Sequence, residues 1–125
     1  MGKVERAIRE AIHPGMQLAT PGQARPFEIA EINTDGIVLL LGQGQWRTPI
    51  PWDALEGLAH LLRGRGWVRT SAAYEYSDDV TTPSGHLKQY VYRETSNCVM
   101  VVLEQAGVVE LDRRRPNKAR LTCAI

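Results

Sequence analysis

Residues 103–121 read LEQAGVVELDRRRPNKARL, and this stretch decides the fold of the C-terminal half of the chain. The apolar and polar residues before Gly107 are typical of the end of a helix, and glycine suits the position just after a helix terminus. Val108–Asp112 then has the composition of a β-strand. The next residues, 113–118, are typical of a basic hairpin loop, and Ala119–Ala124 is the returning strand. The stretch therefore predicts helix, strand, basic loop and strand in succession.

The residues that precede this stretch predict two further helices and a short strand. Pro51 suits the first position of a helix, whose buried stripe is formed by apolar residues at helical spacing: Leu55, Leu58, Ala59 and Leu62. Trp67–Thr70 predicts a short strand, and Ser71–Val80 a polar loop. Thr82 and Pro83 are typical of the start of a second helix, and Thr95 is a good N-cap for a third helix that runs to Ala106.

The order of these elements resembles the winged helix-turn-helix family over residues 52–124. The most similar stretch runs from Gly85-His86-Leu87-Lys88 to Val108-Val109-Glu110-Leu111-Asp112-Arg113. The resemblance implies that the third helix is a recognition helix, that residues 113–120 lie on the wing, and that the partner is double-stranded DNA.

The N-terminal half predicts a helix followed by a three-stranded β-meander. An apolar stripe at helical spacing, from Val4 to Ile12, ends at His13-Pro14-Gly15. The three strands are Phe27–Ile32, Ile37–Leu41 and Trp46–Ile50, and Pro49 places the third strand at an edge, because proline cannot donate a ladder hydrogen bond. This meander resembles N-terminal modules of bacterial restriction-type nucleases. We therefore predict an α+β chain in which a helix and meander subdomain (1–50) packs on a winged helix-turn-helix (51–125).

The distribution of charge locates the expected interface. The net charge of +1 over 125 residues argues against a strongly basic binder, but residues 1–60 sum to −2 and residues 61–125 to +3. Residues 113–120 alone carry five positive charges and no negative one. Crowded cations repel one another, whereas opposite DNA each could neutralise a phosphate and release a counterion. We therefore expect backbone contacts from the cations of the wing: Arg113, Arg114, Arg115, Lys118 and Arg120.

The third helix has two faces at a rotation of about 100° per residue. Its core side is expected to hold Cys98, Val99, Val102, Leu103 and Ala106. The opposite side is expected to present Ser96, Asn97, Met100 and Val101 to the major groove, together with Glu104. Asn97 suits adenine, and apolar Met100 and Val101 suit the C5-methyl of thymine or of methylated cytosine. An equally weighted alternative is that this side packs against the meander or a partner chain.

Other residues fit either an interface or an ordinary surface or core. Five more cations are candidates for phosphate contacts by position, although each of them taken singly fits an ordinary surface residue better: Lys88, Arg93, Arg63, Arg65 and Arg69. The aromatic residues near the junction of the two halves could stack a base, but core packing is the favoured interpretation: Trp46, Trp52, Trp67, Tyr74 and Tyr76.

Catalysis, cofactors and membranes find little support in the sequence. The three histidines and two cysteines form no cluster with metal-ligand spacing, and no nucleophile or phosphate-loop motif occurs. Glu75, Asp78 and Asp79 could bind a divalent ion but fit a solvated loop better. No apolar run reaches the roughly 18 to 20 residues of a membrane span, and the N-terminus lacks the features of a signal peptide. We expect a cytoplasmic protein with no enzymatic activity, no cofactor and no metal.

The sequence thus predicts non-catalytic binding of duplex DNA, either as a transcription regulator or as the reader of modified DNA in a bacterial restriction-modification protein. The chain could belong to a larger polypeptide or form a homodimer. The alternative is a protein–protein interaction module that docks a partner through Met100 and Val101 on the winged-helix surface.

Overall fold

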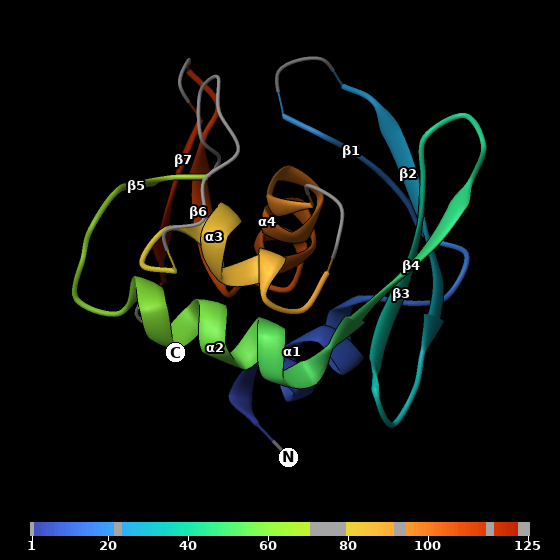
Figure 1. Cartoon of the computed structure of the whole chain (residues 1–125), viewed down its shortest axis with the longest axis horizontal. Coiled ribbons are helices and arrows are strands. Elements are labelled where there is room, and N and C mark those ends of the chain that lie inside the picture. The colour runs from blue at the N-terminus through green and yellow to red at the C-terminus, as the bar shows by residue number, and fades with distance from the viewer. Residues whose placement is uncertain (1, 22–23, 71–79, 92–94, 115–116, 123–125) are drawn as a thin grey trace.

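The computed structural model describes residues 2–21, 24–70, 80–91, 95–114 and 117–122. This part of the chain is a mixture of helices and antiparallel strands, which confirms the α+β class (Figure 1). The elements are, in order, α1 (Lys3–Ala11), β1 (Gln17–Ala19), β2 (Pro26–Ile32), β3 (Gly36–Leu41), β4 (Trp46–Pro51), α2 (Trp52–Leu62), β5 (Val68–Arg69), α3 (Pro83–Lys88), α4 (Ser96–Gln105), β6 (Val109–Asp112) and β7 (Lys118–Leu121).

The N-terminal sheet has four strands in the order β1-β2-β3-β4, so the prediction of a three-stranded meander is wrong by one strand. The additional strand β1 is three residues long and pairs antiparallel with the start of β2, where Leu18 lies opposite Phe27. A segment this short between glycines and prolines carries too little alternation to indicate a strand. The prediction that Pro49 lies on an edge strand is confirmed, because β4 is the last strand of the sheet.

The second sheet joins strands that lie far apart in the sequence. Its order is β5-β7-β6, with Val68 opposite Ala119 in one pair and Leu111 opposite Ala119 in the other. Ala119 is fully buried, so this register fixes the inner face of the sheet. The neighbouring positions on each strand consequently point outward, because side chains alternate along a strand.

Helix α4 lies at the centre of the molecule, between the two sheets (Figure 1). It contacts α3 and β6 of the C-terminal half and also α1 and β1 of the N-terminal half. Buried residues before and after the predicted boundary at 50/51, such as Ile8, Leu39, Leu58 and Leu103, belong to one hydrophobic cluster. The two halves therefore share a core, and the boundary itself stays a prediction.

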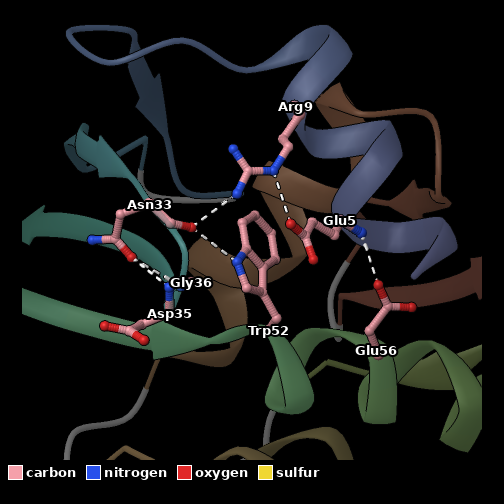
Figure 2. Close-up of polar contacts among 7 residues, drawn as sticks. All are labelled: Glu5, Arg9, Asn33, Asp35, Gly36, Trp52 and Glu56. Atoms are coloured by element: carbon pink, nitrogen blue, oxygen red, sulfur yellow. Dashed lines mark hydrogen bonds and ion pairs between the residues drawn. The ribbon is translucent and has the colours of Figure 1, made fainter. Parts of the chain in front are cut away.

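A polar network fixes α1 and the turn between β2 and β3 onto the start of α2 (Figure 2). The carboxylate of Glu56 accepts hydrogen bonds from the backbone N–H groups of Val4 (3.2 Å) and Glu5 (2.8 Å), so a side chain of α2 caps the N-terminus of α1. The carbonyl oxygen of Asn33 accepts from Trp52 Nε1 and from Arg9 Nη2, each at 3.0 Å. These contacts place the charged groups of this region in structural roles.

The ends of the later helices follow the sequence signals in part. The hydroxyl of Thr82 accepts from the backbone N–H of Gly85 at 3.1 Å, which confirms Thr82 as the N-cap of α3. Gly107 adopts a φ of +78° just after α4, as its C′ position requires. Thr95 is the residue before α4, but its side chain makes no capping hydrogen bond.

Candidate nucleic-acid interface

Three of the predicted wing cations are engaged with carboxylates of their own neighbourhood. Arg113 Nη1 donates to Glu104 Oε2 at 2.6 Å, Arg114 Nη2 to Asp112 at 2.8 Å, and Arg120 Nη2 to Glu110 at 3.1 Å. The sequence showed five clustered cations, but it did not show that α4 and β6 supply carboxylates against them. Exposed pairs of this kind contribute little stability. Their main effect is to lower the local positive potential.

The titration behaviour of these groups reflects the same pairing. The hydrogen bonds from the side chain and the backbone of Arg114 lower the pKa of the half-buried Asp112 carboxyl to about 2. The hydrogen bond to Glu104 raises the pKa of Arg113, and the hydrogen bond to Asp112 raises that of Arg114. The Asp112–Arg114 ion pair is therefore formed at neutral pH.

A basic face lies on the outside of the second sheet, where β5 and β7 pair. Arg69 lies opposite Lys118 in the register of the two strands. Trp67, two residues before Arg69, is exposed on the same side, because Val68 between them lies opposite the buried Ala119. The guanidinium carbon of Arg120 lies over the Trp67 ring, 4.5 Å from its centroid, which is a cation–π geometry. We define the basic face as Trp67, Arg69, Lys118 and Arg120.

The loop that leads into β5 carries two more exposed arginines, Arg63 and Arg65. Gly64 and Gly66 alternate with them and have φ values of +76° and +70°, a backbone conformation that side chains with a Cβ rarely adopt. Arg65 donates to the backbone carbonyl of Thr81, so the loop is tied to the segment before α3. Arginines 63, 65 and 69 therefore follow one another along one exposed strip of chain.

The expectation that α4 presents an open reading face is wrong. Ser96 and Met100 are fully buried and Val101 is nearly so. Helix α4 contacts α1 and β1 of the N-terminal half as well as α3 and β6, and the Ser96 hydroxyl accepts a hydrogen bond from Ser84 of α3 at 3.3 Å. The burial agrees with the alternative of a second packing surface, but the N-terminal elements that contact α4 are α1 and β1, which are not strands of the predicted meander. A helical wheel shows which residues share a face, but two opposite faces of one helix can both be buried when layers lie on both sides.

The remaining predicted site residues fall in different surroundings. Asn97 is half-buried, and its Oδ1 accepts a hydrogen bond from the Thr70 hydroxyl at 2.9 Å, so it links α4 to the end of β5. The Nζ atom of Lys88 is buried. Arg93 and Arg115 lie outside the described residues, as do Tyr74, Tyr76, Glu75, Asp78 and Asp79.

The tryptophans divide into one core residue and two surface residues. Trp52 is buried, as the favoured interpretation of the aromatic residues predicts. Trp46 and Trp67 are 54% and 42% exposed, so for them that prediction is wrong. The spacing Trp67-Val68-Arg69 was the available signal for the second of these, since period-two alternation places the indole and the Arg69 side chain on the same side of an extended strand.

Metal-binding and membrane-spanning features are not found in the part of the chain that the structure describes. No group of three or more histidine, cysteine, aspartate or glutamate residues is arranged to hold a metal ion among these residues. Within the same ranges, no helix has both the length and the apolar character needed to cross a bilayer.

Comparison with known proteins identifies no relative: no family model, no curated protein and no solved structure is significantly similar to this chain.

Proposed function

We propose that this chain binds duplex DNA without catalysing a reaction, and that it does so through the basic face of the second sheet. The observation that carries the proposal is the side-by-side placement of Arg69, Lys118 and Arg120 on one outward sheet surface next to an exposed indole. Cations held on a sheet surface can each contact a phosphate and release a counterion. Tryptophan is uncommon at full exposure in a monomer and is enriched at binding surfaces.

The proposal includes a winged helix-turn-helix arrangement for the C-terminal half. Support comes from the succession α2-β5-α3-α4-β6-β7 and from the sheet order β5-β7-β6, in which β6 and β7 would be the strands of the wing. Because the face of α4 with Met100 and Val101 is buried, the proposed contact uses the wing sheet instead of insertion of that helix face into the major groove.

The local charge supports modest, salt-dependent binding. We call the β5-β7-β6 sheet the proposed wing sheet. Among its described residues and those next to it, five cations and three carboxylates give a net charge of +2: Arg69, Arg113, Arg114, Lys118 and Arg120 against Glu104, Glu110 and Asp112. Arg113 and Arg114 would exchange a carboxylate for a phosphate on binding, whereas Arg69 forms no ion pair with a carboxylate of the described residues. We place the first phosphate contacts at Arg69 and Lys118.

The roles of transcription regulator and of reader in a restriction-modification protein remain open within this proposal, as do a cytoplasmic location and assembly as a homodimer or within a larger polypeptide. Arg93 and Arg115 remain predicted contacts. The protein-interaction alternative would need a surface other than Met100 and Val101, because both are buried.

The test is a titration of a fluorescently labelled duplex with the chain at several salt concentrations, read by anisotropy. We expect log K to fall with log salt at about 0.9 per phosphate contacted. The triple variant Arg69→Ala, Lys118→Ala, Arg120→Ala should lose most of the affinity. Its plot of log K against log salt should be shallower by the contribution of about three phosphate contacts. The matched control removes three exposed cations of the N-terminal half, Lys3, Arg6 and Arg25, and should bind like the wild type. A flat salt response, or equal losses in both triple variants, would overturn the proposal.

A further inference from the structure

We infer that Trp67 is a stacking site for an unpaired nucleobase, so that the chain prefers duplex DNA with an adjoining single-stranded segment over blunt duplex. This inference rests on the proposed function, because it specifies which DNA the basic face takes. It adds a recognition element that phosphate contacts alone do not supply, since phosphates are the same in paired and unpaired DNA.

The indole of Trp67 is both held in place and exposed. Arg120 lies over the ring at 4.5 Å, and Arg120 is itself oriented by its ion pair with Glu110 at 3.1 Å. Despite this cover, 42% of the residue remains accessible. A side chain restrained on one side and open elsewhere loses little conformational entropy when a planar ligand stacks on it.

The neighbours of Trp67 favour a nucleic acid as the source of that planar ligand. The side chains beside it on the sheet surface are cations, Arg69, Lys118 and Arg120, instead of apolar residues. A hydrophobic anchor for a protein partner is typically surrounded by other apolar groups that exclude water. An aromatic ring among cations matches the pairing of a base with its phosphates that single-stranded sites use.

The requirement for an unpaired base follows from the geometry of the ring. In duplex DNA each base is already stacked on both faces, so an indole can stack on it only at an end, at a bulge or after unstacking. A ring that lies on a sheet surface between phosphate-binding cations reaches such a base where the strand leaves the duplex. Every base has a π-face, so this stacking is tolerant of sequence.

Trp46 supplies a matched comparison within the same chain. It is 54% exposed, but its ring lies against the hairpin glycines: a Cβ added at Gly44 would come within 3.2 Å of it. Its neighbour Arg47 forms an ion pair with Glu31 of β2, which lies on the other side of β3 from β4. Trp46 is therefore an exposed tryptophan that packs on its own turn. The arginine that follows it, Arg47, is paired with a carboxylate.

The experiment compares one short duplex in three forms: blunt, with a thymidine tail, and with a tail of equal length made of abasic nucleotides. We expect the wild type to bind the thymidine-tailed duplex at least about tenfold more tightly than the abasic-tailed one, because only the first offers bases. Trp67→Ala should abolish this ratio while it retains blunt-duplex binding. Trp67→Phe should keep part of the ratio, and Trp46→Ala should keep all of it.

The outcomes separate the two proposals. If the wild type binds all three forms equally, or if the tenfold ratio survives in Trp67→Ala, the stacking inference is wrong while salt-dependent duplex binding still stands. If the wild type binds none of the forms, the proposed function fails as well. Thermal unfolding of Trp67→Ala and Trp67→Phe identifies a folding defect, and a ratio that is lost in folded Trp67→Ala but retained in Trp67→Phe supports the inference.

Discussion

The two sheets of this chain each carry an exposed tryptophan beside an arginine, yet they use these residues differently. In the N-terminal sheet, Trp46 rests on hairpin glycines and Arg47 is paired with Glu31. In the C-terminal sheet, Arg120 lies over Trp67, with Lys118 and Arg69 on the same outward face. The first arrangement completes a turn, whereas in the second Arg120, although paired with Glu110, lies with two further cations and an indole on one outward surface.

The carboxylates of the two regions differ in the same way. Glu56 satisfies backbone N–H groups at the start of α1, so its charge holds two helices together. Glu104 instead accepts from Arg113, just after β6 of the C-terminal sheet. Composition treats these two glutamates alike. Their partners make Glu56 a structural group and Glu104 a group that screens the proposed binding surface.

The largest expected effect tests whether α4 belongs to the core or to the interface. Met100 is fully buried between layers, so Met100→Ala should lower the free energy of unfolding by about 2 to 5 kcal/mol, measured by urea denaturation. The exposed Gln105 on the same helix is the control, and Gln105→Ala should change stability by about 0.5 kcal/mol or less.

Binding measurements sharpen the same point. Because Met100 and Val101 are buried, methylated and unmethylated duplexes should bind with equal affinity. If Met100→Ala is as stable as Gln105→Ala and methylation changes the affinity, then α4 does present a reading face to DNA. The distinction between a core helix α4 and a binding surface on the C-terminal sheet would then be wrong.

Glu56 gives the next largest effect. Glu56→Ala removes the acceptor for the N–H groups of Val4 and Glu5, and we expect a loss of about 1 kcal/mol in unfolding free energy with no change in DNA affinity. Glu10→Ala, at an exposed position of α1, is the control and should be close to neutral. Equal stabilities of the two variants would contradict the capping role.

How far the sequence predicts this molecule depends on whether a feature is local. The helix stripes, the cap at Thr82, the positive φ of Gly107 and the edge position of Pro49 all follow from a few neighbouring residues, and all are found. The strand β1 was missed because its three residues are held by pairing with β2, a contact that no alternation within the segment indicates.

The errors at the candidate site have a different physical origin. The sequence indicates a cluster of positive charge at residues 113–120, but the carboxylates that pair with it come from α4 and β6. The burial of Met100 likewise depends on α1 and β1, some eighty or more residues earlier in the chain. Tertiary contacts over such separations decide which charges and which helix faces remain available, and they leave no local pattern.

Glu104 provides a smaller effect on binding. Glu104→Gln removes the carboxylate that holds Arg113, so this arginine can contact a phosphate without exchanging an ion pair. We expect an affinity gain of a few-fold. The slope of log K against log salt should become steeper by the contribution of about one phosphate contact. Glu10→Gln removes the same charge far from the wing and should leave the slope unchanged. An unchanged slope in Glu104→Gln would show that Arg113 does not contact the DNA.

The smallest effect concerns pH. The hydrogen bonds from Arg114 lower the pKa of Asp112 from 3.8 to about 2. Because the folded-state pKa is the lower of the two, the pair stabilises the folded state above about pH 4, and this contribution is lost as the pH falls towards 2. An NMR titration of the Asp112 carboxyl carbon should show the low midpoint, and Arg114→Ala should move it upward. A midpoint that does not move would mean that another group lowers this pKa, and Arg114 would then be free for phosphate at neutral pH, like Arg69 on the opposite edge of the sheet.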